Sequence, residues 1–201
     1  MGQGVTFAYP PGATPLGPDE LTGLKFGHIT TRGELDELEQ ANIAQGLLWL
    51  ERSRGGDILS EDFLRRLHKQ LFGYVWMWAG TFRIHETNIG CAPFEIAPKL
   101  HILLGDARFW SEGETFSPLE AAARFHHRMV QIHLFPNGNG RHARIAADIY
   151  LERYFECPAI DWAGGFDLQM DNVRRDSYIR ALQLADAGQL EPLLEFVGLR
   201  G

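Results

Sequence analysis

The feature that most constrains this chain is a short stretch in which a glycine-rich loop leads directly into a helical pattern. The stretch reads Ile132-His133-Leu134-Phe135-Pro136-Asn137-Gly138-Asn139-Gly140-Arg141-His142-Ala143-Arg144. Its middle has the residue types of a turn, and Gly138 and Gly140 can adopt a positive φ and lie close to a ligand. From Ile145 onward, apolar residues recur at three- and four-residue spacing, which predicts a helix. The loop is therefore expected to end at a helix N-terminus.

The residue types at this predicted helix start suit a ligand with several phosphates. A helix N-terminus presents free N–H groups and a partial positive charge, which together form an anion site. Arg141 and Arg144 are three residues apart, so they project from one side of the first turn, and guanidinium groups match phosphate oxygens. His133 lies just before the loop, where a neutral imidazole can accept a proton from an attacking hydroxyl.

The stretch resembles the Fic signature, H-x-F-x-D/E-G-N-G-R-x-x-R. This chain reads His133-x-Phe135-x-Asn137-Gly138-Asn139-Gly140-Arg141-x-x-Arg144. It departs from the signature at Asn137, where the family usually has Asp or Glu. The resemblance covers roughly residues 33 to 198. Within the family, the chain resembles the small bacterial Fic (Fido) proteins called mobile mystery protein B, which are often found beside a helix-turn-helix protein.

The resemblance implies that this chain is an enzyme, a protein adenylyltransferase. Such an enzyme transfers AMP from ATP to a Ser, Thr or Tyr hydroxyl of a target protein, and pyrophosphate leaves. By position, His133 is the expected general base, and Phe135 is expected to anchor the loop in the core. The expected phosphate-binding residues are Gly138, Asn139 and Gly140 for the chain of phosphates, Arg141 for the β- and γ-phosphates, and Arg144 for the γ-phosphate.

The residue at position 137 affects how Mg²⁺ is expected to bind and which reaction the protein is expected to catalyse. The family's acidic residue binds Mg²⁺, which prefers carboxylates together with substrate phosphates. Asn137 has only a neutral oxygen, so we expect it to hold Mg²⁺ weakly, directly or through water. The related Doc toxin, a phosphotransferase, is similar in having Asn there, but its loop reads A-N-K where this chain has Gly138-Asn139-Gly140-Arg141. AMP transfer is therefore favoured over phosphotransfer. The alternatives are a Doc-like phosphotransferase, transfer of another nucleotide, or a catalytically weak partner-binding module of the toxin–antitoxin kind.

Composition and charge narrow the class of protein. The chain has 201 residues, of which 45% are hydrophobic, and it fits one domain with a real core. Its formal net charge of −7 argues against direct binding to nucleic acid. We find no apolar run of membrane-spanning length and no secretion signal, and Cys91 and Cys157 match no metal or redox spacing. A cytoplasmic protein that does not act at membranes is expected.

The predicted organisation is an extended N-terminal arm over residues 1–27, rich in proline and glycine, followed by a Fic domain over residues 28–201. The predicted helices lie near residues 33–52, 60–73, 98–110, 117–132 and 139–155, with two more at the C-terminal end. The buried side of the first helix is expected to consist of Leu35, Leu38, Ile43, Leu47 and Leu50. The expected fold class is all-α (mainly α), a helical bundle with one short β-hairpin.

The hairpin, called the flap in this family, is predicted in two extended pieces on either side of Cys91. In the family the flap holds the target segment by main-chain pairing, which needs a sheet edge. The expected target-binding residues are Thr87, Asn88, Ile89 and Gly90, and the second piece is Phe94-Glu95-Ile96. A plain surface loop is the alternative.

Many Fic proteins also carry an inhibitory helix, S/T-x-x-x-E-G/N, whose glutamate pairs with the second motif arginine. Thr30-x-x-x-Glu34-Leu35 resembles this motif except at its last position, and Glu37 and Glu39 are further candidates. The alternative for all three glutamates is a solvated, acidic helix start. Because no full internal motif is present, a separate antitoxin-like partner, such as a helix-turn-helix protein encoded nearby, is a second hypothesis for regulation.

Overall fold

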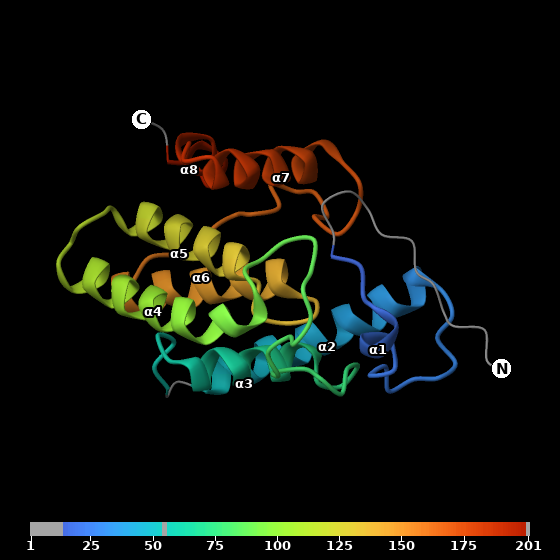
Figure 1. Cartoon of the computed structure of the whole chain (residues 1–201). Coiled ribbons are helices and arrows are strands. Elements are labelled where there is room, and N and C mark those ends of the chain that lie inside the picture. Colours follow the sequence, from blue (N-terminus) through green and yellow to red (C-terminus); the bar gives the residue numbers. More distant parts are fainter. Residues whose placement is uncertain (1–13, 54–55, 200–201) are drawn as a thin grey trace.

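The computed structural model describes residues 14–53 and 56–199, which form a helical bundle (Figure 1). These residues contain eight α-helices and no β-strand, which confirms the all-α class. The helices are α1 (Pro18–Leu21), α2 (Arg32–Arg52), α3 (Glu61–Phe72), α4 (Ile96–Glu112), α5 (Pro118–Ile132), α6 (Asn139–Phe155), α7 (Val173–Asp186) and α8 (Glu191–Phe196).

Short side chains start several of the helices where the sequence predicted them. Ser60 Oγ accepts a hydrogen bond from Phe63 N at the start of α3, and Ser117 Oγ accepts one from Glu120 N at the start of α5. Thr31 begins α2 in the same way. The fourth helix, α4, is longer than the predicted range 98–110, because a 3-10 turn at Pro93–Glu95 leads directly into it.

The helices stack in three layers around α5 and α6 (Figure 1). The middle layer holds α4, α5 and α6, the pair α2 and α3 lies on one side of it, and the pair α7 and α8 lies on the other. Phe125 of α5, Tyr150 of α6 and Leu67 of α3 are fully buried between these layers. The loop that joins α5 to α6 therefore lies at one end of the most enclosed part of the fold.

The buried side of α2 is only in part the predicted apolar side. Leu35 is buried, and Leu38, Ile43 and Leu50 are partly buried and pack against the core. Leu47 is exposed, whereas the buried positions are Leu35, Glu39, Asn42 and Gly46. Asn42 donates to Gln70 O and accepts from Tyr74 N. A Cβ at Gly46 would lie 2.9 Å from Gln70 O, so the backbones of α2 and α3 cross too closely for a side chain there. Hydrogen bonds and a close crossing decide the orientation of α2, because apolar burial alone would have turned Leu47 inward.

The described part of the predicted N-terminal arm packs on the bundle. Lys25 N donates to Val75 O, and the indole of Trp78 donates to Glu20 O. Leu16 is buried in the core. Residues 1–13, the remainder of the predicted arm, lie outside the described residues. Residues 14–27 therefore form one body with the helices, and the boundary at residue 28 stays a prediction.

The expected hairpin does not form, since residues 81–92 are an irregular loop without strand pairing. The guanidinium of Arg83 donates to the carbonyl groups of His85 and Cys91, which ties the loop together. Glu95 accepts from Ala92 N, and Pro93 occupies the first position of the 3-10 turn. The second predicted strand is helical because a proline at this position favours a helix start.

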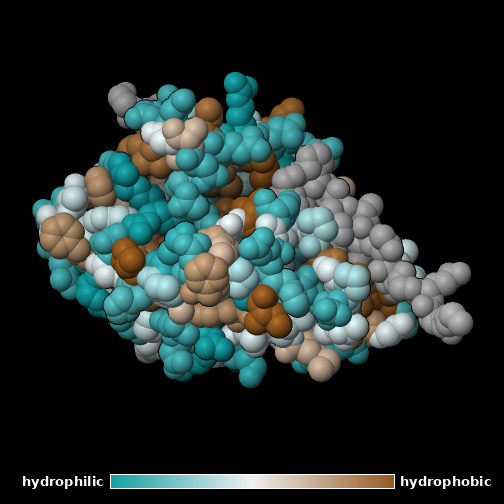
Figure 2. Space-filling model, in the orientation of Figure 1, coloured by the Kyte–Doolittle hydropathy of each residue, from teal (hydrophilic) through white to brown (hydrophobic). Residues whose placement is uncertain are grey.

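The surface around this loop is mainly hydrophilic, with separate hydrophobic spots and a hollow near the centre of the face shown in Figure 2. The exposed hydrophobic side chains include those of Ile84 and Phe94. Within residues 14–53 and 56–199, no helix combines the length and apolar character needed to cross a bilayer.

Candidate active site

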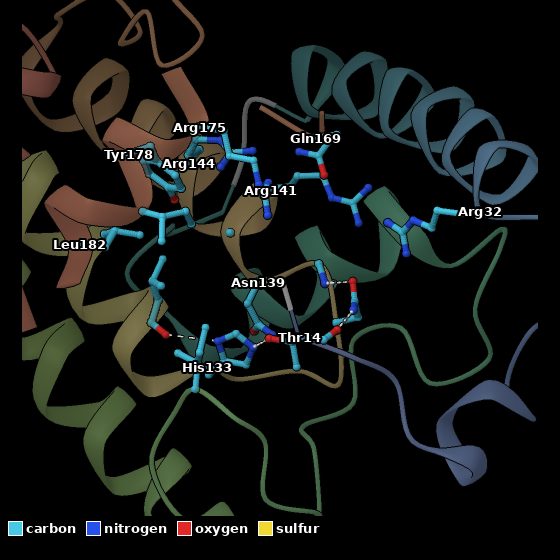
Figure 3. A pocket seen from close by; sticks show the side chains of 16 residues that line it. Thr14, Arg32, His133, Asn139, Arg141, Arg144, Gln169, Arg175, Tyr178 and Leu182 are labelled. Atoms are coloured by element: carbon cyan, nitrogen blue, oxygen red, sulfur yellow. Dashed lines mark hydrogen bonds between the residues drawn. The ribbon is translucent and has the colours of Figure 1, made fainter. Parts of the chain in front are cut away.

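His133 ends α5 in a left-handed conformation, with φ 59° and ψ 69°. This conformation is uncommon for residues other than glycine, although His adopts it more readily than most. Arg83 stabilises the turn, because its Nε donates to His133 O at 2.6 Å and its Nη2 donates to Ile132 O at 3.2 Å. The imidazole consequently faces the pocket between α5, α6 and α7 (Figure 3).

The hydrogen bonds of His133 fix which nitrogen carries the proton. Nδ1 lies 3.3 Å from Val130 O, and Nε2 lies 2.9 Å from Thr14 Oγ1. A carbonyl oxygen only accepts, so Nδ1 carries the hydrogen and Nε2 accepts from the Thr14 hydroxyl. Burial lowers the pKa of His133 to about 4, and the nearby charge of Arg83 acts in the same direction. The imidazole is therefore neutral near pH 7, as a general base must be.

The loop after His133 is held by one aromatic and one amide side chain. Phe135 is fully buried and stacks on His68, with ring centroids 3.7 Å apart. Asn139 Oδ1 accepts from Phe135 N at 2.9 Å, and its Nδ2 donates to Phe135 O at 2.7 Å. The amide of Asn139 thus closes the loop on itself. The group that Asn139 can direct to a phosphate is its backbone N–H in the first turn of α6.

The two loop glycines have different surroundings. Gly138 has φ 76°, and a Cβ there would lie 2.7 Å from the ring of Phe72, so a side chain has no room. A Cβ at Gly140 would lie 3.7 Å from Arg144 Nη1. Gly138 shapes the turn, whereas Gly140 keeps the first turn of α6 open toward the pocket.

The pocket at this helix N-terminus is rich in arginine, although Arg32 and Arg141 form ion pairs with Asp36 and Glu39 outside its lining. Its described lining contains no Asp or Glu, and its arginines are Arg32, Arg141, Arg144 and Arg175 (Figure 3). Arg144 lies over the ring of Tyr178, 5.4 Å from the centroid. In a chain with a net charge of −7, this concentration of guanidinium groups favours an anionic ligand.

The three glutamates considered as inhibitory occupy different environments. Glu34 is exposed, and its carboxylate accepts from Thr30 N and Thr31 N, which lowers its pKa and caps α2. Glu37 is exposed. Glu39 is buried and forms an ion pair with Arg141, the first motif arginine. Of the three, Glu39 is the one that touches the loop helix.

Asn137 binds the N-terminal segment. Its Oδ1 accepts from Gly138 N at 2.7 Å, and its Nδ2 donates to Thr14 O at 2.8 Å. Because the N–H of Gly138 can only donate, the orientation of the amide is determined. Among the described residues, no group of three His, Cys, Asp or Glu side chains is placed to hold a metal ion.

The expected target-binding loop lies directly over His133. A Cβ at Gly90, which has φ 119°, would lie 2.6 Å from His133 Cβ. Ile89 lines the pocket and Asn88 is exposed, while the hydroxyl of Thr87 donates to Ile89 O at 2.5 Å. This loop therefore forms one wall of the pocket and leaves part of its main chain at the surface.

Sequence reasoning missed the side chains that reach the pocket from outside the motif. Gln169 and the α7 residues Arg175 and Tyr178 line it, and Tyr178 Oη hydrogen-bonds His126 Nε2 at 3.0 Å. Polar residues on an otherwise buried helix face are a signal that could have identified the α7 residues. Thr14 carries no such signal, because it lies in a proline- and glycine-rich segment.

Comparisons with known proteins agree with this geometry. Residues 58–151 match the model of the Fic/DOC family. The chain is 29% identical over 145 residues to the protein adenylyltransferase Fic of Drosophila melanogaster, which covers 70% of this chain and 27% of that protein. The corresponding protein of Aedes aegypti is 26% identical over 145 residues, with the same coverage. The chain thus spans little more than a quarter of the length of these curated relatives.

Solved structures share the fold. The BepC protein of Bartonella tribocorum, solved with bound AMPPNP, superposes with a TM-score of 0.67 at 18% identity, covering 89% of this chain and 95% of that one. Fic-1 from C. elegans gives a TM-score of 0.58 at 23% identity, over 80% of this chain and 47% of that one. The helical bundle therefore has the fold of these solved structures. Residues 58–151, which include His133 and the loop before α6, are similar to the Fic/DOC family.

Proposed function

We propose that this protein is an adenylyltransferase that transfers AMP from ATP to a Ser, Thr or Tyr hydroxyl of a target protein. The observation that carries the proposal is the position of His133, whose Nε2 lone pair faces a hydroxyl at the edge of an arginine-rich pocket. A neutral base beside an anion site is the arrangement that nucleotidyl transfer to a hydroxyl requires. The names of the curated relatives support the same reaction.

In the proposed reaction, His133 Nε2 accepts the proton of the target hydroxyl. The hydroxyl oxygen then bonds to the α-phosphorus, the bond from that phosphorus to the β-phosphate oxygen breaks, and pyrophosphate leaves with the electron pair. The backbone N–H groups from Asn139 to Arg141 and the side chains of Arg141 and Arg144 hold the phosphates. Residues 87–90 present main-chain groups at the pocket wall and contact the target segment.

We propose that Mg²⁺ binds together with ATP. The described pocket lining has no carboxylate, and Asn137 Oδ1 already accepts from Gly138 N. The protein can therefore offer the metal one neutral oxygen, directly or through water, and the phosphates supply the charged ligands. When bound, the ion offsets part of the phosphate charge.

Regulation forms a second part of the proposal. Glu39 forms an ion pair with Arg141, so we propose that Glu39 weakens phosphate binding by this arginine. Glu34 and Glu37 do not line the described pocket, which leaves room for control by a separate antitoxin-like partner, such as a helix-turn-helix protein encoded nearby. We further propose that the protein acts in the cytoplasm.

Labelled ATP tests the function. The protein is incubated with a bacterial lysate and with ATP labelled at either the α- or the γ-phosphate, beside His133→Asn and the exposed-histidine control His101→Asn. We expect protein-bound label from the α-position alone, lost in His133→Asn and kept in His101→Asn. Label from the γ-position would instead assign a Doc-like phosphotransferase. No label from either position, together with no ATP binding by calorimetry, would assign a partner-binding module.

A further inference from the structure

We propose that Thr14 is itself an acceptor hydroxyl, so that the protein transfers AMP to its own N-terminal segment. The inference rests on the proposed function. Thr14 Oγ1 lies 2.9 Å from His133 Nε2, although the two residues are 119 positions apart in the chain. Thr14 is 8% exposed. Its hydroxyl is therefore held against the base inside the fold, and it is not a group that approaches from solvent.

The hydrogen-bond direction is that of a nucleophile and its base. Nδ1 of His133 faces the carbonyl of Val130, so Nε2 must accept, and the Thr14 hydroxyl must donate. An oxygen that donates its proton to a neutral imidazole has its lone pairs free for attack. A hydroxyl within hydrogen-bonding distance of a base, with a third group orienting that base, is the general arrangement of an activated nucleophile.

Asn137 provides a second, independent observation. Its Nδ2 donates to Thr14 O at 2.8 Å, so a residue four positions after the predicted base holds the main chain of Thr14. The carboxylate of Asp or Glu, usual at this position of the signature, has no hydrogen to donate and would repel the carbonyl. Asn137, at the position where the signature has Asp or Glu, can thus bind the N-terminal segment that lies in the site.

The segment around Thr14 is presented in the manner of a bound peptide. Pro15 follows Thr14 and restricts the main chain before it toward extended conformations. Leu16 is buried in the core and anchors the segment on its other side. Thr14 lines the same pocket as the first turn of α6 and its arginines, with its side chain directed at His133 (Figure 3). An α-phosphate bound at that helix start would lie in the pocket that the hydroxyl faces.

The transfer is balanced with ATP as the other reactant. The Thr14 proton passes to His133 Nε2, a bond forms between Thr14 Oγ1 and the α-phosphorus, and the bond to the β-phosphate oxygen breaks. Pyrophosphate leaves, and AMP remains on Thr14 as a phosphodiester. The modified oxygen has no hydrogen, so it can no longer donate to His133. Modification therefore releases the contact that keeps this residue in the site.

Mass spectrometry of the purified full chain tests the inference. After incubation with ATP and Mg²⁺, we expect a gain of one AMP group, mapped to the peptide that contains Thr14. Thr14→Ser should retain the modification and Thr14→Val should lose it, while Thr22→Val, a matched change at an exposed threonine of the same segment, should retain it. His133→Asn should abolish it. The rate per molecule should not depend on protein concentration, because the acceptor already lies in the site.

A lysate labelling reaction with α-labelled ATP, run in parallel, separates failure of this inference from failure of the proposed function. If lysate proteins are labelled but Thr14 in the wild-type protein never carries AMP, the inference is overturned and the function stands. Stronger lysate labelling by Thr14→Val in that case would show that Thr14 only covers His133. If neither the protein nor the lysate is labelled, both proposals are overturned. Modification of Thr14 at a rate proportional to protein concentration would contradict transfer within one molecule.

Discussion

Glu39 Oε2 lies 2.7 Å from Arg141 Nη1, and the side chains of Glu39 and Arg141 are 3% and 11% exposed. The other carboxylate oxygen of Glu39 accepts from Trp76 Nε1 at 2.6 Å, and Arg141 lies over the ring of Phe72. The ion pair thus joins α2 to the end of α6 that faces the pocket. Because it neutralises one arginine of the loop helix, it reduces the positive charge that the pocket presents to an anion.

Glu39→Gln should therefore strengthen ATP binding while it weakens the fold. The amide oxygen can still accept from Trp76, but Arg141 loses its counter-charge and becomes available to phosphate. We expect the dissociation constant for ATP to fall about tenfold, which corresponds to ~1.4 kcal/mol. The free energy of unfolding should drop by about 3 kcal/mol, as for other broken buried pairs. Calorimetry and urea unfolding measure the two effects. The control is Glu37→Gln at an exposed position, and equal ATP affinity in both variants would contradict the prediction.

Stability should fall as the pH is lowered below about 6.5, the ordinary pKa of histidine. Burial lowers the pKa of His126 to about 3 and those of His133 and His142 to about 4. Between pH 6.5 and 4 the unfolded chain binds protons at these positions that the folded chain does not, so each residue costs up to roughly 1.4 kcal/mol per pH unit. Burial raises the pKa of Asp148 to about 6, so the folded state takes up a proton there and part of the loss is offset.

Urea unfolding between pH 5 and 8 measures this dependence. Replacing the buried His142 by Gln should make the slope shallower, because one of the groups that titrate differently in the two states is gone. Replacing the exposed His101 by Gln is the matched control and should leave the slope unchanged. Stability that does not vary from pH 7 to pH 5 would show that these histidines do not stay neutral in the folded protein.

Arg83→Ala should destabilise the turn that carries His133. The guanidinium donates to four carbonyl groups, those of Ile132, His133, His85 and Cys91. Its removal takes a donor from each of these carbonyl groups, including that of the buried His133, and we expect a loss of about 3 kcal/mol in the free energy of unfolding. Arg83→Lys keeps the charge but not the planar fork, so it should be intermediate. Arg180→Ala, at an exposed arginine, serves as the control. A loss no larger than the control's would exclude Arg83 as the residue that holds this turn.

Asn137→Asp should lower the Mg²⁺ requirement and also loosen the N-terminal segment. The added carboxylate supplies a charged ligand, so the Mg²⁺ concentration for half-maximal AMP transfer should fall. It also removes the donor to Thr14 O, so hydrogen exchange in residues 14–21 should accelerate. Asn137→Ala separates the effects, because it removes the donor without adding charge. It should accelerate exchange but should not lower the Mg²⁺ requirement. An unchanged Mg²⁺ requirement in Asn137→Asp would show that this side chain does not reach the metal.

The central part of the fold was predictable because its signals are local. Ser117 and Pro118 mark the start of α5, and Gly138 marks the turn before α6. Each of these depends on its immediate neighbours in the sequence, as capping and turn chemistry do. The placement of His133 at a helix end, before an open helix start, follows from those signals.

The orientation of α2 was not predictable in the same way. Its buried side includes Glu39 and Asn42, whose partners are distant residues such as Trp76, Gln70 and Arg141. A pattern of leucines assigns burial from hydrophobicity alone, and it cannot register a hydrogen bond to another helix. The contact of Thr14 with the site has the same character, because it joins positions 119 residues apart.

Gly46 of α2 sets the distance at which α2 and α3 cross, and Glu39 lies on the same helix seven residues earlier. Seven residues span two helical turns, or about 10.5 Å along the axis. Because an α-helix is stiff over that length, a shift of α2 at the crossing is transmitted to the Glu39 carboxylate two turns away. A methyl group added at Gly46 would meet the backbone of α3, and we expect the resulting shift of α2 to weaken the ion pair between Glu39 and Arg141. The charge state of the pocket is thereby coupled to a packing contact in another layer of the bundle.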